Sequence, residues 1–176
     1  TGEANIGNNV TINGNILANS DVNLGNNTTV SGDAYASGDI SGDTTGITGS
    51  YESDYEMPEN PPSLESTYYD NQIAIAATYP AGDKSYSGTQ TVSGTTYVNG
   101  NVTFSLNATI NLTGTATIVA TGTVLVRNGV TFGDRLHVIA GGKVTFENNI
   151  TIGKYGVWYS SVGFDIANNE IVGDVG

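Results

Sequence analysis

The chain has 176 residues, which suits a single domain, and 17 acidic residues against 5 Lys and Arg give it a net charge of −12. A chain this acidic has no basic stripe to neutralise phosphates, which argues against nucleic acid and anionic membrane surfaces as partners. It has no cysteine, which excludes disulfides and thiolate metal sites, and no apolar run long enough to span a bilayer.

An eighteen-residue unit occurs twice in succession near the start of the chain, at 6–23 and 24–41. Gly, Asn-Asn, Thr and Asp recur at equivalent positions of the two copies, and apolar residues recur every six residues. A fixed period of this kind predicts a solenoid, in which three hexads, each a short strand and a corner, make one triangular coil. Thr favours strands, and Asn and Gly tolerate the left-handed backbone of tight corners.

The repeat is interrupted over residues 50–86. An acidic, Pro-rich stretch is followed by good helix formers, which predicts an inserted loop and one helix over about 64–78 with Ser63 as its N-cap. Tyr69 and Ile73 fall on one face of this helix, so we expect it to lie on a face of the solenoid.

The repeat resumes at Thr91 with coils of about twenty residues. We therefore predict an all-β chain that forms one domain over 1–176, a three-faced parallel β-helix of about eight coils of 18–21 residues. Parallel crossovers are right-handed in almost all sheets, whereas the hexad pattern is typical of the left-handed exception. We favour the right-handed form.

Both ends of the chain fall near the same phase of the repeat, and open coils expose unpaired strand edges that invite another chain. Two interpretations remain open: the chain is a fragment of a longer protein, or its subunits stack end to end. The predicted assembly edges are Thr1, Gly2, Glu3, Ala4, Asn5, Ile6, Ile171, Val172, Gly173, Asp174, Val175 and Gly176.

Acidic residues are the candidate metal ligands. Asp21 and Asp39 occupy equivalent corners, where stacking would let them share a calcium ion with oxygen ligands. Glu52, Asp54 and Glu56 in the interruption form a second calcium candidate. The alternative for both groups is a solvated acidic edge, and no other cofactor is predicted.

Asparagine pairs recur at the corners and predict a ladder of hydrogen-bonded side chains. The chain also contains seven Asn-x-Ser/Thr motifs, a slight excess over composition, which would accept glycans in a secreted protein of an N-glycosylating organism. Their asparagines are Asn9, Asn26, Asn27, Asn101, Asn107, Asn111 and Asn149.

Catalytic residues are not evident. His137 is the only histidine, and nothing supports a Ser-His-Asp triad around it. Asp134 and Arg135 adjoin it and are interpreted as an ion pair. Paired carboxylates for sugar hydrolysis cannot be placed, so we predict that the chain is not an enzyme.

Two resemblances follow from these patterns. The hexads of 6–41 resemble the repeat of left-handed β-helix acyltransferases, whose activity relies on a histidine beside basic residues that this acidic chain lacks. The Asn-Asn corners, the Pro-rich interruption before one helix, and the run VIAGGKVTFENNITI are similar to β-solenoid domains of prokaryotic surface proteins associated with PilX-like pilus components. They are also akin to the polymer-forming bactofilins, which lack the helix-bearing insertion. This resemblance implies a non-enzymatic scaffold of the envelope or the extracellular space.

The predicted function is a structural subunit of an extracellular filament or surface appendage, a head-to-tail homopolymer formed by strand addition between open coils. One alternative is an adhesin or a module that binds surface glycans or ice, which regular rows of outward Thr on one face would favour. A hexapeptide-repeat acyltransferase ranks last.

Overall fold

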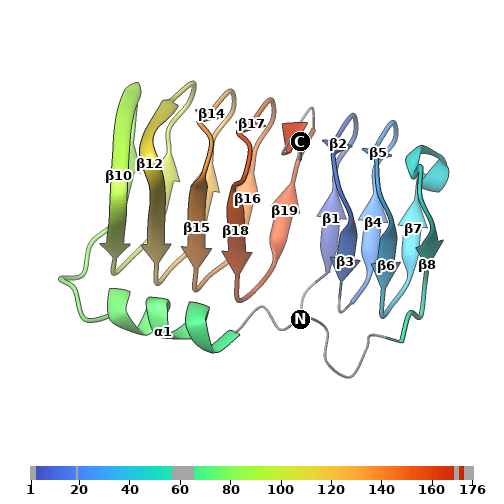
Figure 1. The fold of residues 1–176 in the computed structure, drawn as a ribbon, viewed down its shortest axis with the longest axis horizontal. Coiled ribbons are helices and arrows are strands. Elements are labelled where there is room, and N and C mark those ends of the chain that lie inside the picture. The colour runs from blue at the N-terminus through green and yellow to red at the C-terminus, as the bar shows by residue number, and fades with distance from the viewer. Residues whose placement is uncertain (1–2, 19, 57–65, 169–170, 173–176) are drawn as a thin grey trace.

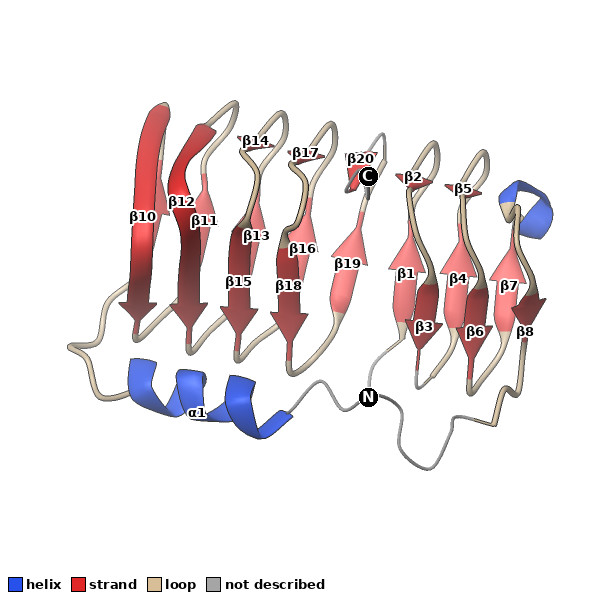
Figure 2. Cartoon of the chain, in the orientation of Figure 1, coloured by secondary structure: helices blue, strands red, loops and turns tan. Residues whose placement is uncertain are grey.

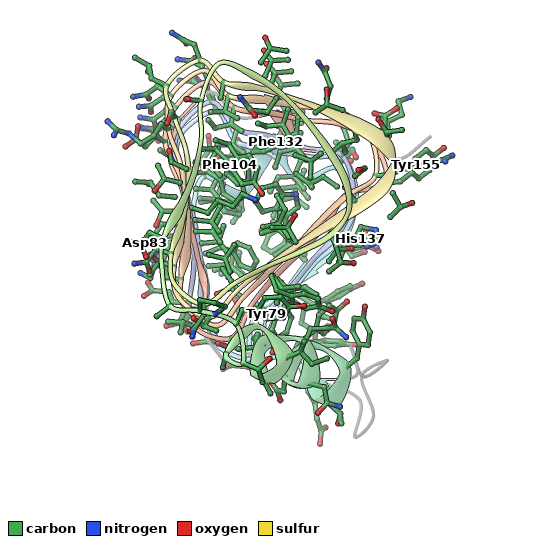
Figure 3. The ribbon with its side chains drawn as sticks, turned by 90° about the vertical axis from the view of Figure 1, so that its left-hand side faces the viewer. Tyr79, Asp83, Phe104, Phe132, His137 and Tyr155 are labelled. Carbon is green, nitrogen blue, oxygen red and sulfur yellow. The ribbon has the colours of Figure 1, made fainter. Side chains whose placement is uncertain are left out.

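The computed structural model describes residues 3–18, 20–56, 66–168 and 171–172. They form a parallel β-solenoid of about 8 turns with one α-helix, as the repeat predicts (Figure 1). The end-on view of Figure 3 shows a triangular coil, with Phe104 and Phe132 inside it. The three sides are called face A, face B and face C below. No helix in the described part of the chain is long and apolar enough to cross a membrane.

Face A is one sheet of 8 parallel strands that runs the length of the stack. Alternate residues point inward, so that Val22 and Leu24 are buried while Asn23 between them is half-buried. In sheet order the strands are β7 (Ile40–Gly42), β4 (Val22–Leu24), β1 (Ala4–Ile6), β19 (Phe164–Ile166), β16 (Val144–Phe146), β13 (Val124–Val126), β11 (Val102–Phe104) and β9 (Lys84–Tyr86).

Face B also runs the length of the stack, mostly as strands of two residues. It begins with the first parts of two long strands, β10 (Thr89–Val98) and β12 (Thr109–Ala120), which then turn onto face C. Gly94 and Gly114 have positive φ near these turns. The remaining strands in order are β14 (Thr131–Phe132), β17 (Thr151–Ile152), β20 (Ile171–Val172), β2 (Thr11–Ile12) and β5 (Thr29–Val30).

Face C is divided into two parts. One part contains the second halves of β10 and β12 with β15 (Leu136–Ala140) and β18 (Val157–Ser160). The other is a 3-stranded sheet of β3 (Ile16–Ala18), β6 (Ala34–Ala36) and β8 (Tyr51–Glu52). A short 3₁₀ helix, η1 (Thr44–Gly46), lies between β7 and β8.

The coils do not stack in chain order. β1 pairs with β4 on one side and with β19 on the other, and β2 likewise lies between β5 and β20 (Figure 1). The coils of residues 3–56, called the N-block, therefore continue the stack after the last coil of residues 84–172, called the C-block. The outer ends of the stack are the coils of β7 and β8 and of β9 and β10.

This order corrects the predicted assembly edges. Ala4–Ile6 and Ile171–Val172 were expected to be free, but both have strand partners on each side. The first and last coils end at equivalent positions of the repeat. The strand edges of the first coil therefore pair with those of the last coil within one molecule. Thr1, Gly2, Gly173, Asp174, Val175 and Gly176 lie outside the described residues.

The predicted helix is observed as α1 (Ser66–Ala76), within the expected range of 64–78, and it lies along the solenoid (Figure 2). Tyr69, Ile73 and Ala76 pack against the C-block, around Val119 and Ile139 of face C. The interruption is shorter than predicted, since β8 and β9 at its two ends belong to the stack. The chain leaves the stack after β8, at the N-block end, and returns to it at β9, at the opposite end.

The core fills the inside of the coils and differs between the blocks. The C-block interior contains an aromatic cluster in which Phe132 makes edge-to-face contacts with Phe104, at 4.9 Å between ring centroids, and with Trp158, at 5.2 Å. The N-block interior has smaller residues such as Val22, Ala18 and Ala36. Each coil therefore buries its apolar side chains only against its neighbours, which is how solenoids hold together.

Candidate functional site

A row of threonines runs along the outside of face B. Backbone pairing places it at one register position in successive strands. In stack order its members are Thr89, Thr109, Thr131, Thr151, Thr11 and Thr29, with Ile171 of β20 holding the position between Thr151 and Thr11. Members on paired strands are separated by about 4.8 Å, whereas Thr151 and Thr11, with Ile171 between them, are two strand spacings apart.

The inward neighbours of these threonines anchor the row. Val30, Ile110 and Phe132 each follow a threonine of the row and are buried at 0%, 0% and 2% exposure. Alternation along a strand therefore turns each threonine outward. Thr131 and Thr151 are exposed, whereas Thr11 and Thr109 are half-buried. Because threonine is branched at Cβ, its side chain is stiff, so the row is a rigid surface feature.

Small, uncharged residues flank the row on both sides. One flank is the A–B corner, with asparagines in the left-handed conformation at Asn9, Asn27, Asn107 and Asn149 (φ of 55° to 59°) and Gly129 at the equivalent place. The other flank contains Asn13, Ser31, Asn111, Gly133 and Gly153. Among the described residues, the outward positions of face B include no charged and no aromatic residue. The described outward positions of face B are therefore uncharged in a protein of net charge −12.

The change in coil length does not disturb this face. The same spacing along the chain separates Val22 from Val30 in the N-block and Val124 from Phe132 in the C-block. The C-block coils gain their extra residues after face B, where β15 is longer than β6. Between the two end coils, faces A and B therefore repeat uniformly, and the difference in coil length lies on face C. The first coil of the C-block is an exception, since Lys84 and Gln90 pair with Val102 and Ile110 but lie two residues closer together along the chain.

An asparagine ladder connects the coils at the A–B corner, although only some of its rungs are the predicted bonds between side chains. Most rungs are backbone N–H groups that donate to the Oδ1 of the asparagine one coil earlier. The donor–acceptor distances are 2.9 Å from Asn148 to Asn128, 3.2 Å from Asn168 to Asn148, 2.7 Å from Asn8 to Asn168 and 2.7 Å from Asn26 to Asn8. The ladder crosses the junction of the two blocks without interruption, so face B is also continuous there.

The ladder reaches Asp43 at the N-block end of the stack. Its carboxylate accepts hydrogen bonds from the side chain and backbone of Thr45 and, at 3.1 Å, from the backbone N–H of Asn27. These bonds, the one from the Thr45 hydroxyl foremost, lower the pKa of Asp43 below its ordinary value. Asp43 also caps η1, so the charged form stabilises this end of the stack.

The calcium candidates are not assembled into a site. Asp21 Oδ1 accepts a hydrogen bond from the backbone N–H of Asp39 at 3.0 Å, so it serves as a corner rung. Glu52, Asp54 and Glu56 are exposed. Within the described ranges, no three Asp, Glu or His side chains are grouped closely enough to hold a metal ion.

The structure explains the recurring Asn-x-Thr motifs. In four of them the asparagine is a left-handed corner residue and the threonine belongs to the row on face B: Asn9–Thr11, Asn27–Thr29, Asn107–Thr109 and Asn149–Thr151. Asn26 and Asn101 take part in corner hydrogen bonds, and Asn111 lies on face B. The motif was the signal for the threonine row in the sequence, where it was interpreted only as possible glycosylation.

His137 lies on the surface of the solenoid. It is half-buried on the outside of face C, in register between Thr117 and Val157 (Figure 3). Arg135 lies over the ring of Tyr155, 6.0 Å from its centroid, and Asp134 accepts a hydrogen bond from the backbone N–H of Lys154. The contacts of Asp134 and Arg135 are therefore with other residues, rather than the ion pair with each other that the sequence suggested.

Comparisons with known proteins give little. No protein-family model matches the chain, and no curated protein matches it. Among solved structures, an ice-binding protein from the Antarctic ascomycete Antarctomyces psychrotrophicus aligns over 96% of this chain and 95% of its own, with 15% identity and a TM-score of 0.23. A likeness at this level carries no argument about function, and it does not bear on the predicted resemblance to PilX-associated or bactofilin solenoids.

Proposed function

We propose that this protein binds ice through face B. The observation that supports the proposal is the threonine row: one residue type, at one register position, repeated along a rigid and uncharged sheet. In this proposal the protein is not an enzyme, and it acts outside the cell, where it meets ice.

The chemistry of the row suits an ordered water surface. Threonines on paired strands present a methyl group and a hydroxyl at intervals of about 4.8 Å, with one interruption at Ile171. This spacing is close to a repeat between water oxygens along an axis of hexagonal ice. Because strand pairing and the core hold the side chains in place before binding, little conformational entropy is lost on contact with the lattice.

A glycan-binding role for the same face has less support. Small-molecule sites are usually concave and lined with aromatic side chains. The described outward positions of face B have neither property, since they are occupied by Thr, Asn, Ser and Gly on a straight row of strands.

The filament remains a second proposal, through the outer ends of the stack. At the C-block end, Lys84 and Gln90 take register positions that are held by Val102 and Ile110 in the next coil. Lys84 lies over the ring of Tyr86, 5.1 Å from its centroid. Polar residues at inward positions are typical of capped solenoid ends. End-to-end stacking therefore has weaker support than ice binding.

The test uses two threonines of a single coil. We expect Thr151→Tyr, on face B, to lose most of the thermal hysteresis activity of the wild-type protein, because a bulky ring interrupts the flat row. The matched variant Thr145→Tyr, on face A of the same coil, should keep that activity. Circular dichroism and thermal melts establish that both variants are folded.

Two outcomes contradict the proposal: a wild-type protein that shows neither thermal hysteresis nor inhibition of ice recrystallisation, or equal losses in the two variants. Uniform filaments of the wild-type chain in negative-stain electron microscopy, without ice activity, would support the structural alternative instead.

A further inference from the structure

The two blocks differ sharply in charge. Residues 1–56 contain no Lys, Arg or His, whereas all 5 basic residues of the chain lie between Lys84 and Lys154. The acidic residues of this first part are Glu3, Asp21, Asp33, Asp39, Asp43, Glu52, Asp54 and Glu56. The N-block is therefore an anionic surface attached to a C-block of balanced charge.

Face C is covered by α1 in the C-block, whereas in the N-block the described residues leave part of it exposed. In the C-block, Val119 and Ile139 point outward from β12 and β15, each just before an inward alanine, and α1 buries them to 0% and 1% exposure. In the N-block the corresponding outward residues are Leu17 and Tyr35, also just before inward alanines. Leu17 is 55% exposed, so no described residue covers it as α1 covers Ile139.

These N-block residues form one contiguous surface, called the tyrosine patch: Leu17, Tyr35, Glu52 and Tyr55. Leu17, Tyr35 and Glu52 lie in register on β3, β6 and β8. Tyr55 stacks on Tyr35 with ring centroids 4.6 Å apart. The patch thus combines apolar and aromatic area with a carboxylate.

The patch lies in a negative field. The nearby charge of Asp33 is the main cause that raises the pKa of Tyr35, followed by burial and by Tyr55 and Glu52. The faces of tyrosine rings attract cations such as the guanidinium of Arg. Carboxylates beside a half-buried aromatic pair therefore favour a positively charged occupant.

We propose that the tyrosine patch is the docking surface for a short, cationic and partly apolar segment of a partner protein, which would cover the N-block as α1 covers the C-block. Three strands span roughly 10–15 Å, enough for about two turns of a helix. So small an interface gives a weak, salt-sensitive complex. The proposal is independent of ice binding, because the patch lies on face C.

The test measures fluorescence anisotropy of a labelled twelve-residue peptide with Leu and Lys at helical spacing, titrated with the full chain. We expect binding that weakens about tenfold in the double variant Leu17→Thr/Tyr35→Thr. The control Leu125→Thr/Tyr155→Thr removes a Leu and a Tyr from the outside of the C-block and should bind like wild type. Thermal melts verify the fold of each variant.

Two further peptides complete the design: one with Glu in place of Lys, and one with Ser in place of Leu. Both should bind much more weakly than the Lys/Leu peptide. Equal binding of the Ser peptide would reduce the effect to general charge attraction and overturn the proposal, as would unchanged binding in the patch variant. Displacement of the peptide by a neutral oligosaccharide would overturn it in favour of a glycan site.

Discussion

Faces A and B run side by side along the same stack, with the same spacing and the same inward apolar pattern, yet their outer surfaces differ. Face A bears ion pairs between neighbouring coils, Arg127 with Glu147 at 2.8 Å and Lys143 with Asp165 at 3.0 Å. Face B presents threonine at almost every coil. The inward positions thus determine the fold, while the outward positions are free to specify function.

The physical reason lies in the stacking itself. A parallel solenoid places each residue directly above its equivalent in the next coil, so identical charges would repel one another. Opposite charges in neighbouring coils, such as Arg127 and Glu147, avoid this repulsion, and a neutral residue such as threonine can repeat without it. Like charges do stack at one corner, where Asp21 accepts a hydrogen bond from the backbone N–H of Asp39. A neutral residue type therefore suits a long row better than a charged one.

The largest expected effect comes from the core beneath each face. Phe132→Ala, behind face B, and Phe146→Ala, behind face A, should each lower the free energy of unfolding by about 3–5 kcal/mol, because both side chains are buried against Trp158. Chemical denaturation measures this loss. Near the freezing point, where both variants remain folded, only Phe132→Ala should reduce ice activity, since its cavity lies under the threonine row. Equal ice activity in the two variants would show that the threonine row does not depend on the core side chain beneath it.

A smaller effect separates the methyl from the hydroxyl of the row. Thr131→Ser removes the methyl group and the β-branch, and should reduce thermal hysteresis more than Thr131→Val, which keeps the shape. The same pair of changes at Thr145 on face A should leave the activity unchanged. A reversed ranking at Thr131 would mean that the hydroxyl dominates the contact with ice.

The corner that joins the two faces should contribute about 1 kcal/mol per rung. Asn148→Ala removes the oxygen that accepts from the backbone of Asn168 and the amide that donates to Asn128 at 3.0 Å. We expect the midpoint of denaturation to fall while circular dichroism remains that of the wild type. Unchanged stability would mean that water replaces the hydrogen bonds of the Asn148 side chain. The ladder would then result from the stacking of the coils without stabilising it.

The smallest effect concerns pH at the capped end of the N-block. The folded-state pKa of Asp43 lies below its ordinary value of 3.8, so its stabilisation is present above that pH and is lost as the pH falls through the folded-state pKa. Asp43→Asn should therefore melt at a lower temperature than wild type at neutral pH. This difference should disappear once the pH is below the folded-state pKa of Asp43, because the wild-type carboxyl is then also neutral. A difference that persists in acid would indicate packing rather than charge.

Much of the architecture was predictable from local pattern. The hexad repeat gave the three-faced parallel solenoid, the asparagine pairs gave the ladder, and Tyr69 and Ile73 identified the helix face that packs on the sheet. These features depend on residues within one coil or one helix, and their spacing along the chain is enough to reveal them. The handedness stays a prediction.

The sequence by itself determined what a coil is, but only the tertiary structure decided the order of the coils and the surfaces they create. Every open coil presents the same pattern of backbone donors and acceptors, so the edge of Ala4–Ile6 suits a neighbour from this chain or from another one. The pairing of β1 with β19 resolved that choice within the molecule, and it also aligned Thr11 and Thr29 with Thr131 and Thr151. A repeat encodes the shape of its unit, whereas the partner of an unpaired strand edge depends on which edges the folded chain brings together.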